Sequence, residues 1–272
     1  MSGRHIFIAS ICLALVMGFA PDPADCQQAG AVYQIPIRGD IELGLAPFVE
    51  RSLEQARVNG AVAAILDIET PGGRVDAAQR IANAIADAEV PVYAFVNRHA
   101  YSAGAMIALA AERVYMRPGS VMGAATPVVG SGDKAPEKIV SAMRSQMRAL
   151  AETRGLDPEV AAAMVDEDIE VEGVVEAGKL LTLTTSEAVE IGYAVEVEDW
   201  DALLADLGIE GAPLQGMQVN WAERIVRFLS NPIVAPFLLS LGFLGLIAEI
   251  KSPGIGIAGF AGLLSLALFF GS

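Results

Sequence analysis

Residues 61–68, A-V-A-A-I-L-D-I, form a nearly unbroken apolar run, and residues 90–96 form a second one. A strand that is apolar on both faces is typical of a parallel sheet with helices packed on each side. Between the two runs, residues 77–87 carry Ile81 and Ile85 on one stripe, which predicts a helix. This alternation of strand and helix predicts an α/β domain whose parallel strands are joined by right-handed crossovers.

The rest of the domain continues the alternation. Phe48 and Leu53, with Ala56 or Val58, mark the inner face of a helix over 47–58. The other expected elements are a strand and turn over 32–41, a helix over 103–111, a strand over 113–116, helices over 137–153 and 158–165, a capping box at Thr184 and Glu187 that opens a short helix, a final strand, and a helix over 200–207. In the helix over 137–153, the expected inward side chains are Ile139, Met143, Met147 and Leu150.

Residues 1–24 have the pattern of a secretory signal peptide. Arg4 supplies a basic end, an apolar run follows over 6–19, and Ala20 or Ala24 fits the cleavage site. An uncleaved N-terminal anchor is the alternative, but the run is short for a membrane span. The α/β domain is expected to cover residues 31–210.

The C-terminal part is expected to enter a membrane. Residues 221–229, W-A-E-R-I-V-R-F-L, are amphipathic and suit a membrane surface, so we place a linker with an interfacial helix at 211–231. Two runs over 233–248 and 254–271 carry no charge, and each approaches the roughly 20 residues that span a bilayer. They predict a transmembrane helical hairpin over 232–272; a buried hairpin of a soluble protein is the alternative.

A signal peptide followed by two spans predicts a multi-pass protein of the cell membrane, with the α/β domain on the extracytoplasmic side. Arg224 and Arg227 would then lie outside, mildly against the tendency of basic residues to stay in the cytoplasm. The sequence stops at Ser272, at the end of an apolar run, which favours a piece of a longer protein.

The composition excludes several classes of function. A net charge of −15 with only 18 Lys and Arg residues argues against a nucleic-acid partner. Two histidines and two cysteines without a cluster do not supply a zinc site, and we expect no metal and no cofactor. Cys12 falls in the apolar N-terminal run, so no internal disulfide framework is expected.

Ser102 is the candidate nucleophile. It stands in the segment 97–110, which we interpret as a tight turn between a strand that ends at Val96 and a helix that begins at Ala103. A serine on such a turn is exposed for attack and lies at a helix N-terminus. Ala103 and Gly104 are small and leave room for a reacting group. An ordinary helix N-cap is the alternative interpretation.

A serine nucleophile needs a general base, and the histidines are poor candidates. His5 falls in the predicted signal peptide, and His99 has no evident third residue to orient it. Lysine is the other choice, and the chain has only Lys134, Lys138, Lys179 and Lys251. Lys138 lies in a first helical turn beside apolar residues, where an apolar face docked over the site would favour the neutral amine. By pattern alone, a solvated lysine is the favoured alternative.

Gly72 and Gly73 follow the buried strand in T-P-G-G-R-V and are candidates for an oxyanion hole. Without side chains they let a substrate approach the backbone N–H groups, and glycine permits the required dihedral angles. The N–H of Ala103, directly after the nucleophile, would be the second donor. By itself, a Pro-Gly-Gly sequence indicates only a turn.

Together, the segments T-P-G-G-R-V, A-Y-S-A-G-A and P-E-K resemble the membrane-bound serine proteases of the NfeD group, in the ClpP/crotonase superfamily. About 30 residues separate Gly72 from Ser102, and about 36 separate Ser102 from Lys138. The resemblance extends over residues 31–272, including L-T-L-T-T-S-E-A-V-E-I-G-Y and the K-S-P-G between the apolar runs. It implies a ClpP/crotonase-like α/β domain with repeated β-α units, followed by transmembrane helices.

The resemblance also implies roles for the candidate residues. Ser102 and Lys138 would form a Ser-Lys dyad, and Gly72, Gly73 and Ala103 would form the oxyanion hole. The implied activity is a serine endopeptidase that cleaves apolar segments of membrane-associated proteins, with a stomatin- or prohibitin-type protein as substrate or partner, in a homo-oligomer. The histidine that follows the serine in ClpP-type enzymes has no counterpart here. Further membrane helices and a small β-barrel domain usually follow in this group, which also favours a piece of a longer protein.

Two other functions fit the same pattern. A non-catalytic scaffold with this fold could organise a stomatin-type membrane complex, with the serine, lysine and glycines retained as structural residues. A crotonase-type acyl-CoA enzyme would use similar pairs of backbone N–H groups, but a secretory signal peptide argues against a cytosolic substrate.

Overall fold

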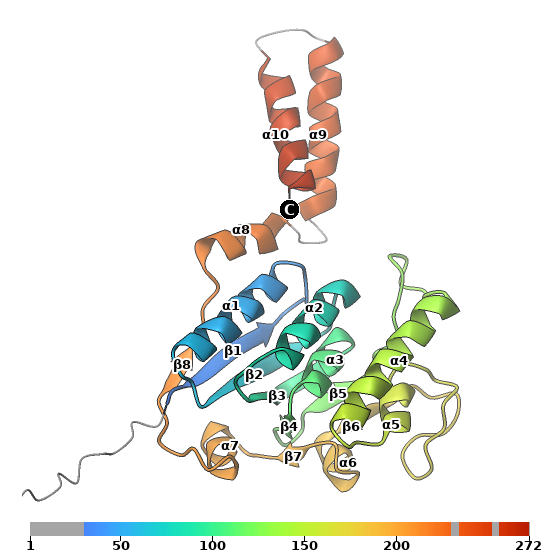
Figure 1. Cartoon of the computed structure of the whole chain (residues 1–272). Helices are drawn as coiled ribbons and strands as arrows, with labels where there is room; N and C mark the ends of the chain where they lie inside the picture. The colour runs from blue at the N-terminus through green and yellow to red at the C-terminus, as the bar shows by residue number, and fades with distance from the viewer. Residues whose placement is uncertain (1–29, 230–233, 252–255, 272) are drawn as a thin grey trace, which may run out of the picture.

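The computed structural model describes residues 30–229, 234–251 and 256–271. These residues form an α/β domain followed by C-terminal helices (Figure 1), so the predicted fold class is confirmed. The predicted signal peptide, residues 1–24, lies outside the described residues.

The described strands form one sheet with the order β6-β5-β3-β2-β1-β8; off this path, β4 pairs with β3, and β7 pairs with β4. Every strand pair is parallel except β5 with β6, as expected for strands joined by helical crossovers. The bounds are β1 Val32–Arg38, β2 Ala63–Thr70, β3 Val92–Tyr101, β4 Arg113–Met116, β5 Val121–Gly123, β6 Thr182–Thr184, β7 Val195–Glu196 and β8 Leu214–Gly216.

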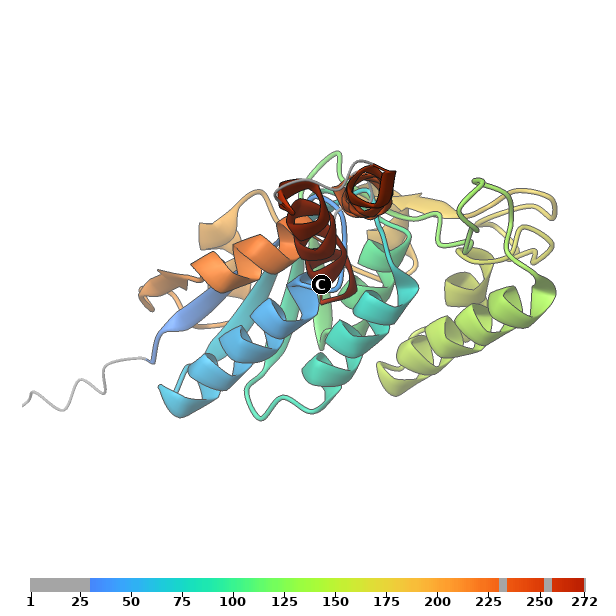
Figure 2. The same cartoon turned by 90° about the horizontal axis from the view of Figure 1, so that it is seen from above.

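Helices cover both faces of the sheet, as the doubly apolar strands predict. On β2, Leu66 packs in the main core with helices α1, α2 and α3, whereas Ile65 packs in a second cluster with Leu203 and Leu204 of α7. Figure 2 shows α1, α2 and α4 running next to one another over the sheet. The bounds are α1 Leu45–Val58, α2 Val75–Ala86, α3 Ala103–Ala110, α4 Glu137–Thr153, α5 Pro158–Ala163, α6 Thr185–Glu190 and α7 Trp200–Asp206.

Some details differ from the sequence-based expectation. In α4, Met143 and Met147 are buried as predicted, but Ile139 is 46% exposed, because the first turn of the helix projects past the core. In α1 the buried residue is Ala56, and Val58 faces solvent. The strand β8, beyond the predicted domain boundary at residue 210, pairs with β1 and so belongs to the sheet.

The predicted capping box is present at the start of α6. The Thr184 side chain accepts a hydrogen bond from the Glu187 N–H, and the Glu187 carboxylate accepts one from the Thr184 N–H. We expect Thr184→Ala to lower the free energy of unfolding by about 1 kcal/mol, because the Glu187 N–H loses its acceptor, the Thr184 hydroxyl. Thermal unfolding against a Thr184→Ser variant, which keeps the hydroxyl, measures this cost; equal stability of the alanine and serine variants would contradict it.

The C-terminal helices follow the α/β domain: α8 Trp221–Leu229, α9 Val234–Lys251 and α10 Ile257–Phe270. Of the described helices, α9 is long and apolar enough to cross a membrane, and α10 is apolar but shorter. The two pack side by side (Figure 1). A Cβ on Gly245 would lie 2.8 Å from the Gly262 Cα, so glycines allow the close approach of their backbones.

Candidate active site

Ser102 lies between β3 and α3. The expected tight turn over 97–101 is wrong: β3 continues through these residues to Tyr101. The physical reason is a second strand partner, since His99–Tyr101 pair with β5 after Tyr93–Val96 have paired with β4. The change of direction is therefore confined to Ser102 itself.

The backbone of Ser102 has φ 54° and ψ −120°, a positive φ that non-glycine residues rarely adopt. The Ser102 N–H donates to the Gly123 carbonyl at 2.8 Å, which fixes the turn. Ser102 occupies the N-cap position of α3, but its side chain makes no capping hydrogen bond, so it does not serve as an ordinary side-chain cap. Strained residues of this kind cluster at functional sites, and a sharp strand-to-helix turn is how a nucleophilic serine is presented.

Gly72 lies directly against this turn, and Gly73 follows it in the chain. A Cβ on Gly72, where φ is +109°, would lie 2.6 Å from the Ser102 Cβ and 3.2 Å from its Oγ. A Cβ on Gly73, where φ is +154°, would lie 2.1 Å from the Ile41 carbonyl oxygen. Both positions therefore require glycine, and the structure brings Gly72, the first residue of the predicted pair, to the predicted serine.

The N–H groups around Ser102 differ in availability. The Gly72 N–H donates to Thr70 Oγ1 at 3.0 Å. Neither the Gly73 N–H nor the Ala103 N–H donates a hydrogen bond within the described part of the chain, and Ala103 is the first residue of α3. Gly73 and Ala103 are thus the free donors of the predicted oxyanion set, while the N–H of Gly72 is already engaged.

The helix behind Ser102 is closely packed. Every residue of α3 is buried, and a Cβ on Gly104 would lie 2.5 Å from the Thr70 Cγ2. The N-terminus of this helix carries partial positive charge at Ser102, which favours negative charge that develops on a bound group. The arrangement fits the stabilisation of an oxyanion.

Lys138 is in the first turn of α4 and is exposed. It has no hydrogen bond or ion pair with the described residues, and none with Ser102. The structure therefore brings together the serine and the glycines but leaves Lys138 uncovered, with neighbouring Ile139 facing solvent as well.

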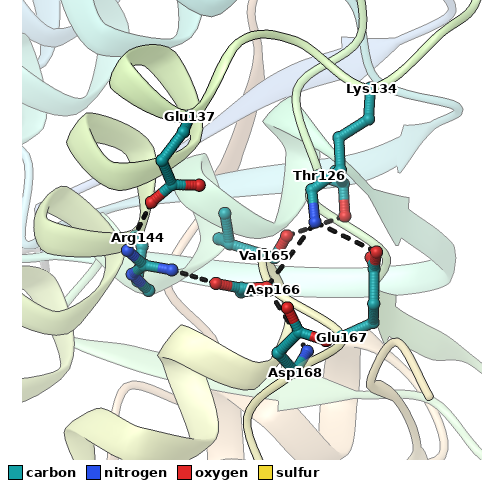
Figure 3. A network of polar contacts seen from close by, with 8 residues as sticks. All are labelled: Thr126, Lys134, Glu137, Arg144, Val165, Asp166, Glu167 and Asp168. Carbon is teal, nitrogen blue, oxygen red and sulfur yellow. Dashed lines mark hydrogen bonds and ion pairs between the residues drawn. The ribbon is translucent and has the colours of Figure 1, made fainter. Parts of the chain in front are cut away.

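Lys134, the other lysine of this region, is engaged in a polar network (Figure 3). Its amine lies 3.0 Å from Glu167 and 3.6 Å from Asp166, and Arg144 of α4 binds the same Asp166. The hydrogen bond to Glu167 raises the pKa of Lys134 above its ordinary value, which disfavours the neutral amine that a base needs. The network also ties the loop before α4 to the segment after α5, where Thr126 Oγ1 donates to the Val165 carbonyl at 2.7 Å.

His99 stacks on Tyr101, with ring centroids 5.2 Å apart, and makes no hydrogen bond to Ser102. His99 and Tyr101 are two residues apart on β3, so both rings project from the same face of the strand. The geometry agrees with the sequence-based argument that His99 is a poor candidate for the base.

Comparisons with known proteins identify the same two parts. A model of the NfeD1b N-terminal domain matches residues 31–217, and a model of the NfeD integral membrane domain matches residues 233–272. With the apolar helix α9, the second match indicates a membrane-associated protein.

Two curated proteins are similar to most of this chain. The membrane protein NfeD1b of Bacillus subtilis (strain 168) is 44% identical over 241 residues, which are 88% of this chain and 55% of that protein. The membrane-bound protease PH1510 of Pyrococcus horikoshii is 26% identical over 262 residues, which are 87% of this chain and 57% of that protein. The chain thus spans about half the length of the curated relatives it matches.

A solved structure has a similar fold. It is a serine-to-alanine variant of the 1510-N membrane-bound stomatin-specific protease, 25% identical, with a TM-score of 0.61. The alignment covers 70% of this chain and 99% of that one.

Proposed function

The chain belongs to the NfeD family, and from that premise we propose that its α/β domain is a serine endopeptidase with Ser102 as nucleophile and Lys138 as general base. The observation that carries the proposal is the backbone of Ser102. Ser102 has a positive φ, its side chain makes no capping hydrogen bond, and it lies against Gly72 and directly before Ala103, whose N–H has no hydrogen-bond partner among the described residues. A serine that served only as a helix cap would have neither the strain nor the free side chain.

The relatives support peptide hydrolysis. PH1510 is a membrane-bound protease, and the solved 1510-N protein is specific for stomatin and was studied as a serine-to-alanine variant. NfeD1b, the more similar of the two curated relatives, is described only as a membrane protein. We therefore assign to this chain the cleavage of apolar segments in a stomatin-type membrane protein. That protein would be both its substrate and its partner.

The reaction proceeds by acyl transfer. The Ser102 Oγ forms a bond to the scissile carbonyl carbon while the neutral amine of Lys138 takes the hydroxyl proton. The carbonyl electrons move to oxygen, which accepts hydrogen bonds from the Gly73 and Ala103 N–H groups. The carbon–nitrogen bond then breaks, the ammonium of Lys138 returns its proton to the leaving amine, and water hydrolyses the serine ester.

Lys138 must be covered for this step, because a lysine acts as a general base only where burial removes it from water. The first turn of α4 would close toward Ser102 when an apolar peptide binds between them. Residues 123–133, which precede α4, would act as the lid, and Val128 and Val129 on this loop expose apolar surface to a substrate. Substrate would thus complete the dyad rather than meet a preformed one.

The remaining assignments complete the proposal. Residues 1–24 are a signal peptide, the protease domain lies on the extracytoplasmic side, and α9 with α10 forms a multi-pass anchor in the cell membrane. The protein acts as a homo-oligomer and needs no cofactor.

The Lys138→Ala variant tests the dyad. We expect cleavage of apolar peptides to fall by about 10²- to 10⁴-fold, the usual contribution of a general base. The measurement is initial cleavage rate of a set of apolar peptides by the whole chain in detergent micelles. Lys179→Ala is the matched control, because Lys179 is exposed, pairs with Glu176 at 2.7 Å and with no other carboxylate of the described residues, and should keep the parent rate.

If parent and Lys138→Ala cleave at the same rate, Lys138 is not the base. If the parent cleaves no peptide of the set while remaining folded, the scaffold function replaces the protease.

A further inference from the structure

The helix α8, Trp221–Leu229, separates its charged and apolar side chains onto opposite faces. At 100° per residue, Glu223, Arg224 and Arg227 fall on one side, and Trp221, Ile225 and Phe228 fall on the other. An amphipathic helix of a soluble domain normally turns its apolar side toward the domain. The orientation of α8 is therefore informative.

The charged side of α8 is the side that contacts the α/β domain. The Arg51 Nε of α1 lies 2.7 Å from Glu223 Oε1, and the Arg227 Nε lies 2.7 Å from the buried Glu42. Burial raises the pKa of Glu223, but the hydrogen bonds from Arg51 and from the Asn220 N–H, together with the charges of Arg51 and Arg227, hold the pKa below its ordinary value. A Cβ on Gly44 would lie 2.8 Å from the Arg227 Cγ, so this contact is also close-packed.

The apolar side of α8 faces away from the domain. Trp221 is 72% exposed, Phe228 is 63% exposed and Ile225 is 49% exposed. In Figure 1, α8 lies between the α/β domain and the α9–α10 pair. The orientation is thus the reverse of the one that buries apolar area within the domain, and three large side chains stay in contact with solvent.

A membrane surface is the occupant that this face fits. The candidate membrane span α9 begins at Val234, five residues after α8 ends, and contacts α8. A helix that joins a membrane span within so few residues must lie at the level of the headgroups. Interfacial helices typically carry tryptophan and phenylalanine on one face and charged residues on the other face.

We propose that α8 lies in the membrane interface, with Trp221, Ile225 and Phe228 among the acyl chains, and that its charged face clamps the α/β domain against the bilayer. This inference is independent of the peptidase activity. It goes beyond the integral anchor, because it fixes how the domain is oriented above the membrane.

The clamp fixes the position of the candidate active site as well. Glu42, the partner of Arg227, follows Ile41, whose N–H donates to the Gly72 carbonyl at 2.8 Å. The Ile41 carbonyl accepts from the Arg74 N–H at 2.7 Å, so Ile41 holds both ends of the Gly72–Gly73 segment. The edge of the sheet that carries these glycines is therefore the edge that α8 holds next to the membrane, within reach of chain that emerges from the bilayer.

Tryptophan fluorescence tests the depth of α8, because the chain has two tryptophans. In Trp200→Phe, Trp221 is the sole reporter, and phenylalanine retains the ring that packs on Phe95 at 5.4 Å. The whole chain is reconstituted in phosphatidylcholine vesicles, plain or containing lipids brominated near the headgroup end or the methyl end of the acyl chains. At a depth of about 5–10 Å, we expect shallow bromines to lower the emission about twofold and deep bromines to lower it less.

The control is Trp221→Phe, which leaves Trp200 in the α/β domain and should show equal emission in all vesicles. A second pair compares two glutamine substitutions in the Trp200→Phe background. Ile225→Gln, on the apolar face, should weaken the shallow quenching, whereas Arg224→Gln, on the charged face, should keep it.

Equal Trp221 emission in plain and brominated vesicles would overturn the proposal. Blue-shifted emission without quenching would also overturn it, because the apolar face would then be covered by protein, such as a second copy of the chain.

Discussion

Replacing Ser102 by alanine is expected to lower the rate of peptide cleavage by roughly 10⁴- to 10⁶-fold, the loss seen when an acyl-transfer nucleophile is removed. The free energy of unfolding should stay unchanged. The Ser102 hydroxyl makes no capping hydrogen bond, so its removal leaves no backbone donor of α3 unsatisfied. A serine that capped the helix would instead cost about 1 kcal/mol on replacement and leave any activity intact.

Ser102→Gly separates strain from chemistry. Glycine adopts a φ of 54° without the steric cost that serine bears, so this variant should be more stable than the parent by about 1 kcal/mol or more. It should be as inactive as Ser102→Ala. Greater stability together with lost activity is the signature of a residue held in a strained conformation for function.

Both effects are measurable on the whole chain in detergent micelles. Cleavage of apolar peptides gives the rate, and thermal unfolding of the parent, Ser102→Ala and Ser102→Gly gives the order of stability. Cleavage at the parent rate by Ser102→Ala would remove Ser102 from the mechanism. A Ser102→Gly variant less stable than the parent would contradict the strained turn.

The fold was predictable from sequence where burial is nearly complete. The run over 61–68 has apolar residues on both faces, so only a doubly covered strand satisfies it, and β2 is such a strand. The errors lie at edges. Residues 97–101 are mostly polar, yet they continue strand β3. Their backbone can do so because a different strand, β5, pairs with the part of β3 that lies beyond β4. Likewise, Ile139 fits the apolar spacing of α4 but lies past the end of the core.

The contact between Ser102 and the glycine segment was predictable from the sequence, but the conformation around it was not. Small residues around Ser102 and a glycine pair after a buried strand are visible in the sequence, and the structure places them in contact. The hydrogen bond from the Gly72 N–H to Thr70 Oγ1 depends on a local turn, which the spacing of residues in the sequence does not reveal. The exposure of Lys138 depends on where α4 starts relative to the core, and a pattern of apolar residues defines a helix face more firmly than a helix end.

The largest effect on the folded state is expected for Gly73→Ala. The new Cβ would lie 2.1 Å from the Ile41 carbonyl oxygen and 2.6 Å from its nitrogen, in a residue whose φ is +154°. Ile41 cannot move aside cheaply, because its N–H and carbonyl are both hydrogen-bonded to the segment around Gly73. Backbone strain and overpacking together should lower the free energy of unfolding by about 3 kcal/mol or more.

Gly119→Ala is the matched control. Gly119 also has a positive φ, +79°, but a Cβ there would meet nothing within 4 Å, so only the left-handed backbone cost of about 1–2 kcal/mol applies. Thermal unfolding of the two variants isolates the clash at Gly73. Since the Gly73 N–H is a proposed oxyanion donor, Gly73→Ala molecules that remain folded should also cleave about 10²- to 10³-fold more slowly.

The same two variants also test whether the Gly73 segment is coupled to the contact between α8 and the α/β domain. Any shift that accommodates a side chain at Gly73 must displace Ile41, and with it Glu42, the residue that holds Arg227 of α8. Gly73→Ala should therefore loosen α8 from the α/β domain, which amide hydrogen exchange of residues 221–229 would detect as faster exchange than in Gly119→Ala. Equal stability, cleavage and exchange in the two variants would show that Gly73 is an ordinary turn residue, and that neither the oxyanion donor nor the clamp depends on it.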